Sequence, residues 1–255
     1  MMVVIFRHVG TTALLREMLK MSVKTPASCS AHSLSTLPGM LSGPAAFRGL
    51  TLHRVFLKSA VVRQSTWSSS DPVGQEVIWA LGAGCRDITS LNIAPLQPCQ
   101  QPNRFSNRCL QTIGRCWPHL HQVGVGGTSC GLQGLTSLVR NCSSVCVLEL
   151  DHMSEISQQG AAELCREGLQ QLHTLIFSYT PVTAKAILHF HSVCLRLKCI
   201  IVLMSYADYF DDPESEEAKR IFNEMISSLQ ALKKRPGLTD ILQVRVDQCD
   251  ILAGS

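Results

Sequence analysis

The stretch Cys142-Ser-Ser-Val145-Cys-Val-Leu148-Glu-Leu150 carries the pattern that decides the fold of this chain. A cysteine or leucine is followed three, six and eight residues later by apolar residues. Six copies occur, and the first of those later apolar positions advances by 32, 25, 27, 25 and 44 residues from copy to copy. Recurrence at intervals of roughly 20 to 50 residues is typical of repeat solenoids. The copies begin at Cys85, Cys116, Cys142, Leu169, Cys194 and Leu238, with one additional residue after Cys116.

The spacing within each copy has a physical cause. Leu148 and Leu150 alternate as on a β-strand and face the core, whereas Glu149 between them points to an open face and to solvent. No single unit buries its own apolar side, so neighbouring units stack into one continuous core. The sequence therefore predicts an α/β leucine-rich-repeat solenoid, with a curved parallel sheet and helices on its outer face.

Helices are predicted between the strands, because a serine or threonine precedes several stretches of helical apolar periodicity. A further helix of about 20 residues is predicted after Asp212-Pro213-Glu214, which offers a cap, a proline at the first helical position and an acid in the first turn. The shorter helices are expected at 107–115, 158–168 and 184–193, with Ser106, Ser157 and Thr183 as their N-caps.

The chain divides into four parts on this interpretation. Residues 72–204 form the leucine-rich repeats, and residues 205–255 form an acidic loop, the long helix and a terminal repeat strand. Residues 47–71 are interpreted as a degenerate first repeat, with its strand at Leu52–Leu57. Residues 1–46 are interpreted as a poorly ordered basic leader or an altered start to a longer protein. Their composition overlaps with that of mitochondrial transit peptides, but the arginines form no clean amphipathic stripe.

Charge and composition exclude several classes of partner. The chain has a net charge of +4, but residues 1–70 carry +7 and the remainder carries −3. The repeat region has no basic stripe interleaved with aromatic residues, which argues against nucleic-acid binding. No apolar run approaches the roughly 18 residues that cross a membrane. Of the twelve cysteines, Cys85, Cys116, Cys142 and Cys194 recur at one equivalent repeat position and suit buried free thiols, which predicts a reducing, cytoplasmic location.

The sequence predicts no catalytic, cofactor-binding or metal-binding residues. His189 and His191 diverge by about 200° on a helix, so they do not converge with Cys194 on one metal ion. Asp151-His152 resembles part of a nucleophile-activating set, but no hydrolase signature surrounds it, and Asp151 is expected to lie on the open face as a solvated or partner-contacting acid. The glycines at 124, 126 and 127 do not match a phosphate-binding fingerprint, and we interpret them as a tight exit from a strand.

An acidic stretch runs from Asp208 to Glu217. Such stretches usually form a solvated loop and helix start, and the alternative is a docking site for a basic partner.

Cysteine at the closing position of successive repeats resembles the cysteine-containing subclass of leucine-rich repeats, which is common in F-box proteins. Longer strings resemble one member of that family over roughly residues 72–248. They begin at Pro98, Val125, Leu148, Thr180, Ala207 and Leu229, and include Pro98-Cys-Gln-Gln-Pro102-Asn-Arg-Phe105 and Leu148-Glu-Leu-Asp-His152.

This resemblance implies a substrate receptor of an SCF-type ubiquitin ligase. In that family an F-box recruits the Skp1 adaptor and a cullin, and the repeats present the protein substrate. An F-box of roughly 45 residues opens with a leucine-proline-x-glutamate motif, and Ala13–Leu19 is too short and lacks the proline. We therefore expect Skp1 and cullin as partners only where the full-length product contains an F-box. The alternative is a stand-alone interaction scaffold, or a competitor that binds substrate without delivering it.

On either hypothesis the chain is not an enzyme, and its partner is a protein bound on the concave sheet face. The residues expected to line that face occupy outward strand positions: Asn92, Gln122, Glu149, Asp151, Thr174, Ile176, Ile201 and Arg245.

Overall fold

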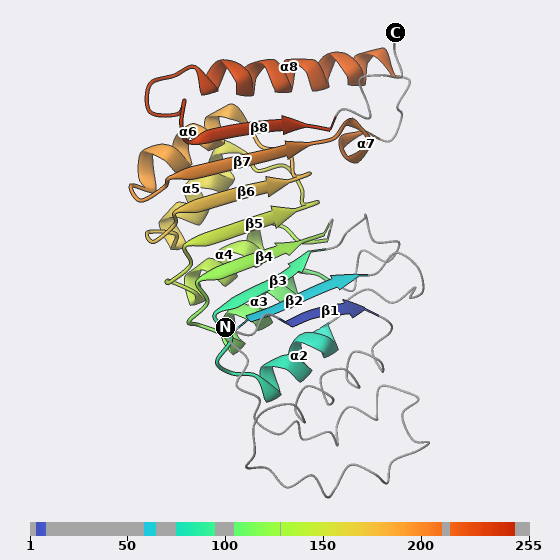
Figure 1. Cartoon of the computed structure of the whole chain (residues 1–255), viewed down its shortest axis with the longest axis vertical. Helices are drawn as coiled ribbons and strands as arrows, with labels where there is room; N and C mark the ends of the chain where they lie inside the picture. The colour runs from blue at the N-terminus through green and yellow to red at the C-terminus, as the bar shows by residue number, and fades with distance from the viewer. Residues whose placement is uncertain are drawn as a thin grey trace, which may run out of the picture.

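The computed structural model describes residues 4–8, 59–64, 75–94, 105–127, 129–210 and 215–247 (Figure 1). The strands are β1 Val4–His8, β2 Ser59–Gln64, β3 Ser90–Ala94, β4 Gln122–Gly126, β5 Val147–Asp151, β6 Thr174–Ser178, β7 Cys199–Met204 and β8 Leu242–Val246. The helices are α2 Gln75–Gly84, α3 Asn107–Cys116, α4 Leu132–Asn141, α5 Gln158–Glu167, α6 Ala184–Val193, α7 Tyr206–Tyr209 and α8 Glu216–Lys233.

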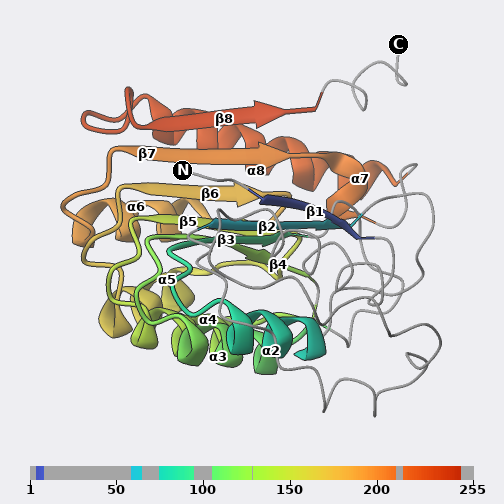
Figure 2. The same ribbon diagram turned by 60° about the horizontal axis from the view of Figure 1, so that its bottom comes forward.

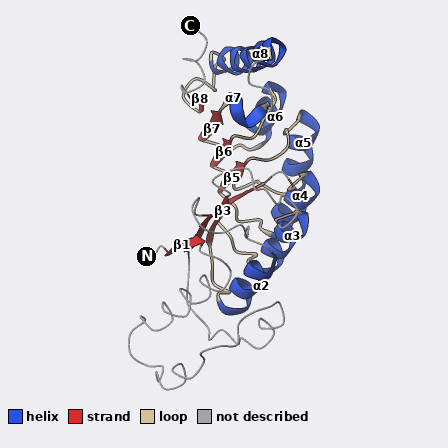
Figure 3. Ribbon diagram, turned by 90° about the vertical axis from the view of Figure 1, so that its right-hand side faces the viewer, coloured by secondary structure: helices blue, strands red, loops and turns tan. Residues whose placement is uncertain are grey.

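The eight strands form one sheet in chain order, and every neighbouring pair is parallel. Figure 3 shows α2 to α6 on one side of this sheet, along the outer side of a gentle arc, and Figure 2 shows the same helices in a row below the strands. Among the described elements, no helix covers the opposite face, which we call the open face. The predicted α/β solenoid is therefore confirmed, whereas the cysteine-containing subtype stays a prediction.

The core lies between the strands and the helix layer. In β5 both Leu148 and Leu150 are fully buried, while Glu149 between them is only half-buried. Leu148 is the register partner of Val123 in β4 and of Leu175 in β6. The inward positions of successive strands therefore stack into one apolar layer, as the alternating pattern predicts.

Trp117, rather than Cys116, occupies the closing position of the second repeat. The backbone N–H of Trp117 donates to Ile113 and its carbonyl accepts from Leu120, as Cys142 does with Leu138 and Val145 in the next repeat. Trp117 is 1% exposed, and its indole Nε1 donates to the Cys85 carbonyl at 2.6 Å. The sequence interpretation placed Cys116 at the closing position and counted one additional residue after it. That assignment was wrong, because Trp117, a large aromatic residue, fills the place that cysteine fills in other repeats.

Side-chain caps begin two of the three predicted short helices. Ser157 accepts from the backbone N–H of Gly160, and Thr183 accepts from that of Ala186. Ser106 precedes α3 as predicted but makes no side-chain cap hydrogen bond. The long helix begins after Ser215, whose hydroxyl accepts from the Ala218 N–H. The cap predicted at Asp212 lies outside the described residues.

The helix α4 escaped prediction because its N-cap residue is Gly131, which has no side chain to cap with. The amide oxygen of Asn107, in the preceding helix α3, accepts from the Gly131 N–H at 2.8 Å. This cap therefore comes from a neighbouring repeat, and a local sequence pattern does not show it.

The N-terminal divisions stay predictions. The strand β1 lies within residues 1–46 and β2 within 47–71, and most of both ranges lies outside the described residues. The strand expected at Leu52–Leu57 also lies outside them. At the other end of the sheet, α8 packs against β8 and α6 and closes the stack (Figure 1).

Buried thiols close three of the repeats. Cys85, Cys142 and Cys194 are free and buried. Burial raises the pKa of Cys85 from its ordinary 9.0 to about 11 and that of Cys142 to about 12, so both thiols remain protonated near neutrality. Cys165 Sγ lies 3.8 Å from Cys194 Sγ, which joins α5 to the end of α6. These thiols act as small apolar side chains in the core.

Candidate protein-binding face

All eight predicted site residues lie at outward positions of the open face. The sheet register aligns Asn92, Glu149, Ile176 and Ile201 in one row across β3, β5, β6 and β7, with Gly124 at the β4 position. The other four lie in flanking rows: Gln122 and Thr174 toward the amino ends of the strands, and Asp151 and Arg245 toward their carboxyl ends. Their role in binding stays a prediction.

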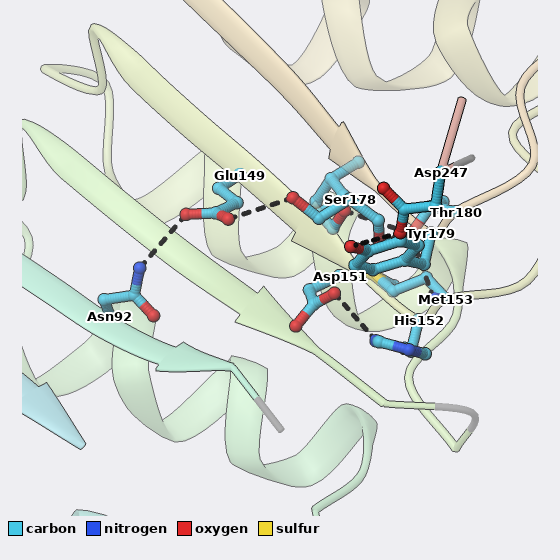
Figure 4. Close-up of polar contacts among 10 residues, drawn as sticks. Asn92, Glu149, Asp151, His152, Met153, Ser178, Tyr179, Thr180 and Asp247 are labelled. Atoms are coloured by element: carbon cyan, nitrogen blue, oxygen red, sulfur yellow. Dashed lines mark hydrogen bonds and ion pairs between the residues drawn. The ribbon is translucent and has the colours of Figure 1, made fainter. Parts of the chain in front are cut away.

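Glu149 connects three strands. It was expected to point freely to solvent, and it does not. Its Oε2 accepts from Asn92 Nδ2 at 3.0 Å, and its Oε1 accepts from Ser178 Oγ at 3.0 Å (Figure 4). Both hydrogen bonds are partly buried. The expectation of a solvated carboxylate was wrong, because two polar side chains reach it. Asn92 lies two strands away on β3, and Ser178 lies on the adjacent strand β6.

The bond between Asn92 and Glu149 passes over β4, where Gly124 leaves the space for it. A Cβ atom at position 124 would lie 2.6 Å from Asn92 Nδ2. The glycine interpreted from the sequence as part of a strand exit therefore has a second role, which is to admit a side-chain bridge across the strand.

Asp151 is 6% exposed, so the expectation that it lies solvated was also wrong. Its Oδ1 lies 2.7 Å from Nδ1 of His152, which is itself 9% exposed. The His152 ring packs on Tyr179 with 5.1 Å between centroids and a tilt of 38°. A buried carboxylate needs a hydrogen-bonding partner, and the neighbouring imidazole supplies it.

In three consecutive repeats, the residue that follows the strand has a left-handed backbone conformation. Gly127, His152 and Tyr179 have φ of 121°, 47° and 51°, and each donates its backbone N–H to a carbonyl of the next strand. Gly127 confirms the predicted tight exit. A side chain in this region costs about 1 to 2 kcal/mol per residue, so His152 and Tyr179 occupy positions whose backbone favours glycine.

Side-chain hydrogen bonds connect the carboxyl ends of β5 to β8, and the sequence interpretation missed the residues that make them. Tyr179 Oη donates to Asp247 Oδ2 at 3.1 Å, which bridges the end of β7 (Figure 4). Thr180, fully buried, accepts from the Met153 N–H and donates to the Leu150 carbonyl. The position of His152 and Tyr179 in the sequence could have indicated these contacts. Each residue directly follows the last residue of a strand, so both lie at the same edge of the parallel sheet.

The remaining predicted site residues differ in exposure. Gln122 is exposed and accepts from Ser90 Oγ at 3.1 Å, and Arg245 is exposed and donates to Gln243 Oε1 at 3.1 Å. Thr174, Ile176 and Ile201 are half-buried. The face therefore offers polar, charged and apolar groups within one continuous surface.

Two kinds of feature are missing from the residues that the structure describes. Within those residues, no group of three or more His, Cys, Asp or Glu side chains is placed to hold a metal ion. Across the same residues, no helix is long and apolar enough to span a membrane.

A stack of parallel strands and helices with one helix-free face defines a repeat module of the leucine-rich-repeat kind, which binds partners through extended surfaces. No family model matches the chain. Over 180 residues it is 63% identical to F-box only protein 41 of Mus musculus and 62% identical to F-box only protein 41 of Homo sapiens. The alignments cover 71% of this chain and 21% of each relative. The predicted resemblance to F-box only protein 41 is therefore confirmed, and the chain spans about a fifth of the length of these relatives.

Proposed function

We propose that this chain is the substrate-recognition module of an SCF-type ubiquitin ligase, non-enzymatic in itself and cytoplasmic. The observation that carries the proposal is the 62–63% identity to F-box only protein 41 over 180 residues. F-box proteins generally act as substrate adaptors. On this proposal Skp1 and a cullin bind through an F-box of the full-length product, and a protein substrate binds the open face.

The open face suits that role for a physical reason. Its outward side chains project from a rigid parallel sheet whose inward residues, such as Leu148 and Phe177, are fully buried. A surface fixed by a packed core loses little conformational freedom on binding, which favours affinity. Ile176 and Ile201 supply apolar contact, and Glu149 and Arg245 supply charge.

The test is affinity purification of the full-length gene product, tagged at its chromosomal locus. Skp1 and a cullin are expected in the eluate, and residues 1–255 expressed alone serve as the matched control. A full-length product with an F-box that recovers neither subunit overturns the proposal.

The second candidate is a stand-alone scaffold or competitor, which binds a protein on the open face without delivering it to a ligase. The two candidates differ in their effect on a bound substrate. Overproduction of residues 1–255 alone lengthens the substrate's half-life if the chain competes with a ligase. Overproduction of a full-length receptor shortens it.

A further inference from the structure

The open face has a polar half and an apolar half. Over β3 to β5 the central row of outward residues consists of Asn92, Gly124 and Glu149. Asn92 and Glu149 are joined by a hydrogen bond that passes over Gly124. Over β6 and β7 it continues through Ile176 and Ile201, which are register partners. Leu203 lies two residues farther along β7 and faces the same way.

Ile176, Ile201 and Leu203 form a contiguous patch, which we call the isoleucine patch. All three are half-buried, and none belongs to the buried core on the other side of the sheet. Adjacent large aliphatic side chains on a solvent-facing surface expose apolar area that a partner would cover. The core does not require them, because the inward residues of the same strands fill it.

The two edges of the sheet beside the isoleucine patch carry opposite charges. Among the described residues that follow β4 to β8 at the carboxyl edge there is no lysine or arginine, and Glu155 and Asp247 are exposed there. The opposite, amino edge carries the exposed Arg196 and Lys198 just before β7. A ligand lying along the patch therefore meets negative charge at the carboxyl edge.

Tyr179, the residue that follows β6, contacts both a residue of the patch and the acidic edge. The Tyr179 N–H donates to the Leu203 carbonyl at 3.0 Å, and its phenol donates to Asp247 at 3.1 Å. Tyr179 thus holds a ring and a carboxylate side by side at the end of β7 (Figure 4). A lysine or arginine close to an aromatic face gains a cation–π interaction in addition to its attraction to a carboxylate.

We propose that the isoleucine patch, Tyr179 and Asp247 bind a segment of a protein partner in which a lysine or arginine lies close to a large apolar side chain. The apolar side chain packs on the patch, and the cation lies beside the hydrogen-bonded pair of Tyr179 and Asp247, against the phenol ring and the carboxylate. This inference rests on the proposed function, because it names the class of substrate segment that the receptor face accepts.

The test is selection of a phage-displayed library of random 12-residue peptides on the immobilised full chain. Enriched peptides are expected to carry Lys or Arg within about three residues of Leu, Ile, Phe or Trp. The dissociation constant of the best peptide is then measured by fluorescence anisotropy. Replacement of its basic residue by glutamine, and Asp247→Lys in the protein, are each expected to weaken binding about tenfold or more. The two changes together are expected to weaken it less than the sum of the separate effects on the free energy of binding.

Matched variants separate the face from the rest of the molecule. Ile201→Ser is expected to weaken peptide binding at least tenfold, whereas Ile221→Ser is expected to leave it unchanged. Ile221 is 38% exposed on α8, away from the open face. Melting temperatures check folding, and the exposed Asp247 provides a second variant that does not depend on packing.

Three outcomes overturn the inference: enriched peptides without basic residues, binding unaffected by Ile201→Ser and Asp247→Lys, or a patch occupied by a second copy of the chain. Sedimentation shows the last as a dimer that Ile201→Ser dissociates. None of these results depends on Skp1 or a cullin. A failure of ligase recruitment therefore removes the proposed function and leaves the peptide result standing, and the reverse also holds.

Discussion

Asn92 on β3 donates a hydrogen bond to Glu149 on β5 across an intervening strand, with 3.0 Å between Nδ2 and Oε2. The bond exists because β4 presents Gly124 at the crossing point. Three neighbouring repeats are thus coupled through their open-face side chains as well as through their core.

The first prediction concerns this crossing. Gly124→Ala places a Cβ 2.6 Å from Asn92 Nδ2, so the asparagine side chain must turn away and lose Glu149. The expected loss of unfolding free energy is about 1 kcal/mol, the net value of one such hydrogen bond. In an Asn92→Ala background the same glycine substitution is expected to have little effect. Urea unfolding of the four proteins in this cycle gives the coupling, and a loss that persists undiminished in the Asn92→Ala background contradicts the bridge.

The repeat architecture could be predicted from sequence because it depends on local spacing. Leu148 and Leu150 face the core because side chains alternate along a strand, and that rule needs no knowledge of neighbours. The closing position of the second repeat was missed because a cysteine was expected there, and Trp117 satisfies the same geometry with a larger side chain.

The open face was harder to predict because its contacts join residues that lie far apart in the sequence. Glu149 was expected in solvent, yet its partners lie 57 and 29 residues away in the chain. Asp151 was likewise expected to be solvated, and it is buried against His152. Alternation showed which side these residues occupy, but their exposure depends on partners that only the sheet register brings together.

The second prediction compares adjacent residues of β5. Leu148→Ala removes a fully buried side chain and is expected to cost about 2 to 5 kcal/mol, through lost burial and a cavity. Glu149→Ala removes two partly buried hydrogen bonds and is expected to cost about 1 to 2 kcal/mol. Thermal and urea unfolding measure both. A larger loss for Glu149→Ala than for Leu148→Ala would mean that the strand register is wrong.

The third prediction concerns the left-handed backbone of His152, whose φ is 47°. His152→Ala loses the contacts with Asp151 and Tyr179 and keeps the unfavourable backbone, whereas His152→Gly loses the same contacts and relieves the backbone. The glycine variant is expected to be more stable than the alanine variant by about 1 kcal/mol. Gln158, the first residue of helix α5, provides the control, because the same pair of substitutions there is expected to favour alanine. An alanine variant at 152 as stable as the glycine variant contradicts the assignment.

The fourth prediction is a dependence of stability on alkaline pH. Burial raises the pKa of Cys85 to about 11 and of Cys142 to about 12, from 9.0. Between pH 9 and these values the folded chain retains protons that the unfolded chain loses. The stabilisation is therefore fully present below pH 9 and is lost as pH rises through about 11 for Cys85 and about 12 for Cys142, by about 1 kcal/mol per pH unit for each thiol.

Urea unfolding at pH 8, 9, 10 and 10.5 in the presence of a reductant measures this slope. Cys85→Ala and Cys142→Ala are expected to lower stability at every pH and to flatten its decline above pH 9. The exposed Arg245 provides a control position, because Arg245→Ala is expected to leave the slope unchanged. A slope unaffected by removal of both thiols contradicts the prediction.

We propose that the open face receives substrate for a ubiquitin ligase. The most direct test is quantitative ubiquitin-remnant proteomics in cells that lack the gene and are complemented with the full-length product, either wild type or carrying Ile201→Ser with Asp247→Lys. We expect a set of ubiquitinated lysines that disappears with the gene, returns with the wild type and stays absent with the variant, while Skp1 recovery is equal for both. Restoration of the same lysines by a folded variant would contradict the claim.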